Sequence, residues 1–574
     1  MHQVSSGSRI FRFSTFELDV HAGELRKQGL KIKLQEQPLR ILEMLLASRG
    51  QIVTREELRI ALWPANTLVD FDHGLNKAIN KVREALGDSA ESPRFIETLA
   101  RRGYRFLGDV SGDAKQIRSL LILPLENLSQ DPEQGYFADG LTEAITTTLA
   151  KVSALRVLSR TTAVLYKRAQ KTLPEIAREL GIDGVVEGTV LRSEERVRIS
   201  AQLLHAPTDT HLWTESYDRD MRDILALQSE VAGAIAEEIQ VTVTPHEQTQ
   251  LAHAPVVDPE AYDAYLRGCY FWDKRTPAAT QRAIESFKQA IARDSSLAAA
   301  HAGLAECFGV LGWWGYVPPA EGCRKAKALS LQALELDPNL AAGHAALAWA
   351  TQYYDYDFLT AEKEFRRAIE LDPHYPIARY RLAMTLAHVG RSEEAIAEAK
   401  CALSLDPLAY TANAVVCWVY WFAREHDRLL AHAKQIVELH PDVPHSHWPL
   451  GFGYLETGNF DAAIPAMRRA VETGGATLFL ALLAETYAVA GHHEEAQKIL
   501  LQLLGSSREQ FVTPYMVGRI YAALGKKDEA FRWLNTAYEE RAPWMVLLKR
   551  DPRLDVLRTD PRYEALLGRM NFPS

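Results

Sequence analysis

The chain has 574 residues, of which 47% are hydrophobic and 24% are charged, so it is long enough for several domains and its composition excludes a wholly disordered protein. The net charge of −9 is spread unevenly, because residues 1–110 carry 17 Lys/Arg against 14 Asp/Glu. We therefore expect a slightly basic first part on an acidic body, which makes nucleic acid a candidate partner of the first part only.

The sequence carries no signal for secretion or for membrane insertion. Residues 1–9 are polar and lack the hydrophobic core of a signal peptide. The longest apolar stretch, residues 414–423, is far shorter than the ~20 residues of a spanning helix. The five cysteines include no Cys-x-x-Cys pair, which is typical of reduced thiols buried as small apolar groups. We expect a cytoplasmic protein.

The first region, residues 9–110, is predicted to hold three helices among short strands. Thr54 and Glu57 have the spacing of a capping box at the start of the second helix, and Gly87 follows the expected end of the third. In chain order we expect strands over 11–20 and 30–34, helices from Pro38 to Gly50, from Thr54 to Pro64 and over 72–86, and a hairpin over 95–107.

The third of these helices has two different faces. At 100° per residue, Leu75, Ile79 and Val82 fall on one side. The other side and its edges are rich in amides and cations, which can reach base edges and phosphates; they are His73, Asn76, Lys77, Asn80, Lys81 and Arg83. A solvated amphipathic helix has a similar pattern, so the helix alone leaves both interpretations open.

The second region, residues 117–243, alternates short apolar strands with helices, which predicts a compact α/β domain. Asp139 and Glu143 could form a carboxylate pair, although a capping role for Asp139 at the start of a helix near Gly140 is the preferred interpretation. The glycines of this region lack the spacing of a phosphate-binding loop. A stretch containing Pro and Ala, residues 244–259, is the expected linker to the third region.

A three-residue motif recurs in the third region at intervals of about 34 residues, the period of helix–turn–helix solenoids. Its copies are Leu336-Asp337-Pro338, Leu371-Asp372-Pro373, Leu405-Asp406-Pro407 and Leu439-His440-Pro441. A Gly and an Ala five residues later keep the same period, for example at Gly390/Ala395 and Gly458/Ala463. This predicts a solenoid of about eight helix pairs over residues 260–541, with residues 542–574 as a cap.

Each region resembles a known family. Residues 10–108 resemble the winged helix-turn-helix output domain of OmpR/PhoB-type regulators, through Leu62-Trp63-Pro64, the run 81–88 and Arg101-Arg102-Gly103-Tyr104-Arg105-Phe106. The middle region is similar to the TolB-like amino-terminal domain, through residues 123–129, 137–143, 184–188 and 211–218. The repeats resemble tetratricopeptide units, which implies an inner surface that receives peptides or partner domains.

In the winged-helix family the third helix enters the major groove and the hairpin, called the wing, contacts the minor groove or the backbone. The resemblance implies that Asn76, Lys77, Asn80, Lys81 and Arg83 face DNA, with Arg101 and Arg102 on the wing; Tyr104 and Phe106 are expected in the core of the wing. Asn80-Lys81 stands where many members have two arginines, so the base preference stays open. No receiver domain is recognised, so control by aspartyl phosphate is not expected.

The sequence thus predicts a multidomain α+β protein, with a winged helix-turn-helix head (9–110), a small α/β domain (117–243), an all-α tetratricopeptide solenoid (260–541) and a C-terminal cap (542–574). We expect a transcription regulator that binds double-stranded DNA and a protein partner in the repeat groove. RNA polymerase and a second copy on DNA are further candidate partners. We expect no membrane partner, no cofactor, no bound metal and no catalytic residue. Two alternatives stay open, an adaptor that does not bind DNA and an enzyme whose α/β domain turns over a nucleotide.

Overall fold

The computed structural model divides into two compact units, Met1–Gln116 and Ile117–Ser574, which we describe separately. It describes residues 10–20, 22–27, 30–48, 52–62, 71–91, 93–99, 102–108, 111–112, 117–129, 131, 134–168, 171–193, 196–239, 244, 257–274, 276–314, 316–441, 443, 446–474, 477–506 and 512–573.

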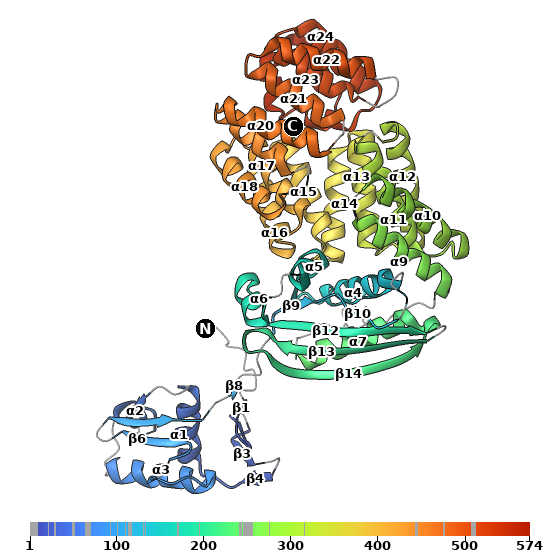
Figure 1. The fold of residues 1–574 in the computed structure, drawn as a ribbon. Coiled ribbons are helices and arrows are strands. Elements are labelled where there is room, and N and C mark those ends of the chain that lie inside the picture. Colours follow the sequence, from blue (N-terminus) through green and yellow to red (C-terminus); the bar gives the residue numbers. More distant parts are fainter. Residues whose placement is uncertain are drawn as a thin grey trace. The chain divides into compact units, whose positions relative to one another are not determined.

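The first unit combines two small antiparallel sheets with three helices (Figure 1). The strand orders are β4-β3-β2-β1-β8 and β5-β7-β6. Phe11, Leu45, Ile79 and Phe106 come from different elements and are all at most 1% exposed, so sheets and helices share one core. The elements are β1 (Ile10–Phe13), β2 (Phe16–Asp19), β3 (Glu24–Lys27), β4 (Leu30–Ile32), α1 (Glu36–Ala47), β5 (Ile52–Thr54), α2 (Arg55–Leu62), α3 (Phe71–Leu86), β6 (Ile96–Leu99), β7 (Gly103–Phe106) and β8 (Ser111–Gly112).

Two local features explain how α2 and the β6–β7 hairpin are fixed. The predicted capping box is confirmed, since the Thr54 backbone N–H donates to Glu57 Oε2 (2.7 Å) and the Glu57 N–H donates to Thr54 Oγ1 (3.2 Å). At Gly103 a Cβ atom would lie 2.1 Å from the Val53 carbonyl oxygen. Strands β5 and β7 can therefore pair at this point only because residue 103 has no side chain.

The second unit begins with an α/β part, whose mixed six-stranded sheet has the order β11-β9-β12-β13-β14, with β10 beside β12. Along β12, Val186 and Val190 pack under α4 and α7, whereas Val185 points to the opposite face, under α5 and α6. The elements are β9 (Ser119–Ile122), β10 (Glu126–Asn127), α4 (Gly135–Ala150), β11 (Arg156–Val157), α5 (Arg160–Arg168), α6 (Leu173–Leu180), β12 (Gly184–Ser193), β13 (Arg196–His205), β14 (Thr210–Asp220) and α7 (Ile224–Glu238).

One expectation about this part was wrong. Helix α4 begins at Gly135 and not near Gly140, so Asp139 lies inside the helix and cannot cap its start. Its carboxylate instead forms an ion pair with Arg160 of α5 (3.1 Å). The neighbouring Glu143 is exposed one turn later on α4.

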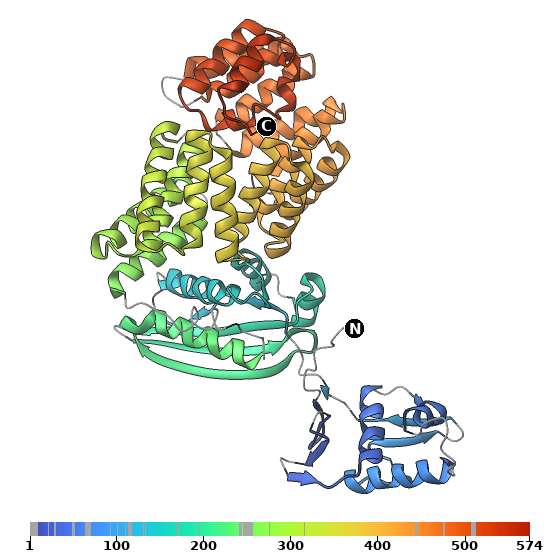
Figure 2. The ribbon, with the colours of Figure 1, turned by 180° about the vertical axis from the view of Figure 1, so that it is seen from behind.

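The rest of the second unit is a solenoid of eight helix pairs within the described residues, followed by short C-terminal helices (Figure 2). Gly451 allows α19 and α20 to approach closely, because a Cβ atom there would lie 2.8 Å from Met467. No described helix has the length and apolar character needed to cross a membrane. The pairs are α9 (Pro259–Asp273) and α10 (Pro277–Arg293), α11 (Ala298–Trp314) and α12 (Pro319–Leu336), α13 (Ala341–Ala350) and α14 (Phe358–Leu371), α15 (Pro376–Val389) and α16 (Ser392–Leu405), α17 (Tyr410–Phe422) and α18 (His426–Leu439), α19 (His447–Glu456) and α20 (Phe460–Gly474), α21 (Thr477–Val489) and α22 (His493–Ser506), α23 (Pro514–Ala523) and α24 (Lys527–Glu539).

The α/β part is docked on two of the Leu-Asp-Pro turns of the solenoid. The Thr162 hydroxyl donates to Asp406 Oδ1 (3.1 Å), and the Ser159 backbone N–H donates to the Leu405 carbonyl (3.1 Å). In the preceding turn, His374 Nδ1 lies 2.7 Å from the carbonyl oxygen of Ala150. Burial raises the pKa of Asp406 to about 6, and it raises the pKa of Asp372 to about 6 as well.

Candidate nucleic-acid interface

Helix α3 presents a polar row opposite its buried face. Leu75, Ile79 and Val82 are at most 1% exposed, whereas Lys77 and Asn80 are exposed. Neither Lys77 nor Asn80 has a side-chain hydrogen bond to another residue in the part of the chain that the structure describes. The ammonium group of Lys77 is thus available for a phosphate, and both halves of the Asn80 amide are available for a base edge.

Lys81 lies at the edge of this row and is half-buried. Its ammonium group donates to Gln35 Oε1 (2.6 Å), which draws the side chain toward the start of α1. Gln35 is exposed, so the charge stays at the surface. Lys81 can therefore still attract phosphate, from a position fixed by Gln35.

Asn76 belongs to a three-residue cluster that joins α2, α3 and the wing, which is the β6–β7 hairpin. The Tyr104 hydroxyl donates to Asn76 Oδ1 (2.9 Å), and Arg55 donates to both Asn76 Oδ1 (3.2 Å) and the Tyr104 hydroxyl (2.9 Å). Because Oδ1 already accepts two bonds, Asn76 cannot offer the acceptor half of a two-point contact with adenine. The cluster holds the wing against α3, and sequence reasoning missed Arg55 because it is 49 residues from Tyr104.

Arg83 does not face the solvent, contrary to the expectation from its position at the edge of the polar face. It is 6% exposed, and its guanidinium donates to the Ile96 carbonyl (2.9 Å) and to Thr98 Oγ1 (2.8 Å). Both acceptors lie on the first strand of the wing. Arg83 therefore fastens the wing to α3, and we leave it out of the proposed DNA-contacting set.

Asp88, just after α3, has a related role. Its carboxylate accepts the backbone N–H groups of Arg94 (2.7 Å) and Ile96 (2.8 Å). A left-handed Gly87 ends the helix immediately before it. These contacts fix the start of the wing relative to the end of α3.

The wing itself is partly described. Tyr104 is 2% exposed and Phe106 is 1% exposed, which confirms that they are core residues of the wing. Arg102 is exposed at the turn between the two strands. Arg101, the side chain of His73 and the Trp63-Pro64 segment lie outside the described residues.

Elsewhere, a cleft of about 980 Å³ opens between the α/β part and the first helix pair. Four arginines and four carboxylates line it, and the central Asp263 is shared by Arg192 and Arg267 (3.0 Å from Arg267). Such balanced pairs give the cleft no excess charge for an ionic ligand. Among the described residues, no group of three or more His, Cys, Asp or Glu side chains is placed to hold a metal ion.

Comparisons with known proteins agree with this geometry. The family described as transcriptional regulatory protein, C terminal, matches residues 29–106, and the tetratricopeptide repeat family matches residues 364–397. The transcriptional regulator HilA of Salmonella typhimurium is 23% identical over 97% of this chain and 99% of its own length. A cholera toxin homolog transcriptional activator of Vibrio parahaemolyticus is 30% identical over 18% of this chain and 36% of its own length.

A third relative, the putative adenylate cyclase 3 of Rhizobium meliloti, is 37% identical over 41% of this chain. The chain spans only 40% of that protein. The head is thus a winged-helix DNA-binding domain of the transcriptional-regulator type, and the solenoid that follows it in the chain contains a tetratricopeptide repeat.

Proposed function

We propose that this chain is a cytoplasmic transcription regulator that binds double-stranded DNA through α3 and the wing and receives its input through protein contacts of the solenoid. The observation that carries the proposal is the exposed pair Lys77 and Asn80 on an α3 whose other face is fully buried. In the proposed complex Asn80 contacts a base edge, while Lys77, Lys81, Arg101 and Arg102 contact phosphates. We propose His73, near the start of α3, for the same set.

The test compares single variants of the full chain in a DNA-binding titration at several salt concentrations. The slope of log K against log salt is negative, and Lys77→Ala is expected to reduce its magnitude by about 0.9, because one phosphate contact is lost. Asn80→Ala is expected to keep that slope and to reduce the preference for the best site over random DNA by about 1–3 kcal/mol. Lys31→Ala is the matched control, since Lys31 is exposed on β4 and pairs with Glu24 (2.6 Å).

Two outcomes would contradict the proposal. If Lys77→Ala and Asn80→Ala both bind as Lys31→Ala does, the contact surface is wrong. If the full chain does not bind duplex DNA even at low ionic strength, the adaptor alternative replaces it.

We propose further that the α/β part is a TolB-like domain that binds the solenoid and fixes its position. The sequence segments 123–129, 137–143 and 184–188 support the family assignment, and the docking of Ser159 and Thr162 on residues 405–406 supports the positioning role. RNA polymerase and a second copy of the chain are proposed partners on DNA. Footprint length and the mass of the DNA complex test the second copy, and transcription from purified components tests the polymerase.

One observation favours a second candidate function, the synthesis of cyclic AMP, because a relative is named as a putative adenylate cyclase. We nevertheless propose that the chain is not an enzyme. Incubating the full chain with ATP and Mg²⁺ and assaying cyclic AMP tests this, and formation of cyclic AMP above a heat-treated control would contradict it.

A further inference from the structure

Two first helices of the repeat pairs, α21 and α23, are buried on almost every side. A solenoid helix that lines an open inner surface keeps a solvated polar stripe. Helix α21 instead is apolar almost all round, and its one acidic residue, Glu485, is 0% exposed. Helix α23 carries Arg519, which is also 0% exposed. Some other part of the chain must cover these inner positions.

The cover is the C-terminal segment, residues 542–573, which runs along the repeats. The ring of Trp544 stacks on Trp313 of α11 (4.6 Å between centroids), and its Nε1 donates to the Trp313 carbonyl (3.3 Å). The hydroxyl of Tyr356 donates to the Ala542 carbonyl (3.1 Å), and the ring of Phe572 stacks on Phe358 (4.5 Å). In both views the C-terminus lies beside the middle of the solenoid and not beyond α24 (Figures 1 and 2).

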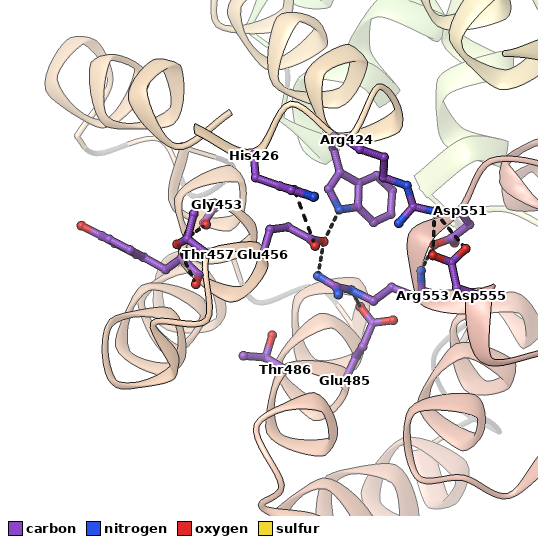
Figure 3. Close-up of polar contacts among 12 residues, drawn as sticks. Arg424, His426, Gly453, Glu456, Thr457, Glu485, Thr486, Asp551, Arg553 and Asp555 are labelled. Carbon is purple, nitrogen blue, oxygen red and sulfur yellow. Dashed lines mark hydrogen bonds and ion pairs between the residues drawn. The ribbon is translucent and has the colours of Figure 1, made fainter. Parts of the chain in front are cut away.

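The charged groups of the segment match those of the inner helices (Figure 3). Arg553 pairs with Glu456 of α19 (2.7 Å) and lies 3.9 Å from Glu485. Asp551 lies 3.5 Å from Arg519. Glu485 and Arg519 also pair with each other (2.6 Å), and the segment completes this buried network by placing an acid beside Arg519 and a base beside Glu456 and Glu485.

The apolar contacts are equally extensive. Residues 545–548 are at most 1% exposed, and Leu554 and Leu557 are 0% exposed. A cap would contact the last pair alone. The segment does contact α24, through Arg562 and Asp528 (2.8 Å), but it also reaches α11, more than 200 residues earlier in the chain.

We propose that residues 542–573 are an intramolecular ligand of the solenoid: they occupy its inner face as a partner peptide would, and a partner reaches this face only by displacing them. The partner that fits carries an aromatic anchor followed by an acid and a base seven and nine residues later, the spacing of Trp544, Asp551 and Arg553. This rests on the proposed role of the solenoid as the receiver of input, and it concerns no residue of the DNA-contacting face.

The test separates the segment from the folded chain. A protease site is inserted between Glu540 and Arg541, where the chain makes an exposed turn after α24, and the full chain is purified folded and then cut. A fluorescent synthetic peptide of residues 542–573 is added in excess. We expect the cut segment to stay bound during gel filtration and to exchange with the labelled peptide, while the solenoid keeps its helical circular dichroism.

Two further peptides make the result specific. A peptide with Trp544→Ala is expected to bind at least about 100-fold more weakly, because the anchor is lost. A peptide with Arg562→Gln should bind as the natural one does, since its side chain is 46% exposed. Unfolding of the chain on cutting, or no exchange with excess peptide, would overturn the proposal, because the segment would then be an inseparable part of the core. DNA binding of the uncut chain is measured separately, so failure here is distinct from failure of the proposed function.

Discussion

Asp406, at the contact between the α/β part and the solenoid, should make the stability of the protein depend on pH. Its side chain is 6% exposed, and burial raises its pKa from 3.8 to about 6 although Thr162, Ser159 and Thr161 donate hydrogen bonds to it. A carboxyl whose pKa is higher in the folded state holds a proton there between pH 4 and 6, while the unfolded chain has lost it. Its contribution to stability is therefore full at low pH and is lost as the pH rises through 6.

The magnitude follows from the two pKa values. Between pH 4.5 and pH 8 this one group is expected to lower the free energy of unfolding by about 2 kcal/mol. Asp406→Asn removes the titration but keeps the shape of the side chain. The difference in stability between variant and natural protein should therefore shift by about 2 kcal/mol in favour of the variant over this pH range.

The assay is urea unfolding followed by tryptophan fluorescence at several pH values. Asp337→Asn is the matched control, because Asp337 has the same place in an earlier Leu-Asp-Pro motif, where its carboxylate accepts only the Asn339 N–H (2.9 Å) among the described residues. Its pH profile should run parallel to that of the natural protein. If Asp406→Asn loses the same stability at pH 4.5 and pH 8, the carboxylate is ionised throughout and the reasoning is refuted.

Three further substitutions test contacts elsewhere. Gly103→Ala should destabilise the head by at least about 2 kcal/mol, because the new Cβ meets the Val53 carbonyl; thermal unfolding of the full chain measures it, and an unchanged head transition would contradict the close approach. Arg83→Ala should lower the stability of the head by about 1–3 kcal/mol, because the wing loses its hydrogen bonds to α3, and amide hydrogen exchange at residues 96–98 should become faster. A loss of DNA affinity with unchanged exchange would instead indicate that Arg83 contacts DNA. Arg519→Met should lower the stability by about 3–5 kcal/mol, because Asp551 loses the cation 3.5 Å away and Glu485 keeps only Arg553, at 3.9 Å; a urea midpoint equal to that of the natural protein would show that the pair is not needed.

Much of the fold could be predicted, because its signals are local or periodic. The capping box at Thr54 is fixed by residues within one turn, and the solenoid is indicated by a motif at a constant spacing. The start of α4 could not be predicted from Asp139, since no side chain caps the helix and its partner Arg160 lies in another element. The sequence does not predict helix α5 or strand β14 individually, because their buried residues contact other elements and do not follow one clear period.

The candidate site was predictable as a face but not residue by residue. Helical periodicity separates Lys77 and Asn80 from the core, and the structure agrees. Helical periodicity cannot distinguish an exposed cation from one whose side chain folds back onto a neighbouring element. Arg83, at the edge of that face, hydrogen-bonds to Ile96 and Thr98 of the wing. Nor can it reveal that Asn76 is engaged by Arg55, because that contact depends on how the wing folds over α3.

In the solenoid, the departures from the repeat carry more information than the repeat itself. A period of about 34 residues requires only that each pair packs on the next. Trp418, Phe452, Glu485 and Arg519 follow one another at steps of 34, 33 and 34 residues, yet two are aromatic, one is acidic and one is basic. Neighbouring repeats account for part of this variety, because Glu485 and Arg519 pair with each other (2.6 Å). A non-repeating surface opposite the four positions accounts for the rest. The C-terminal segment provides it, with Trp544 against Trp418 (6.2 Å between centroids), Arg553 over Phe452 (5.5 Å) and near Glu485 (3.9 Å), and Asp551 beside Arg519 (3.5 Å).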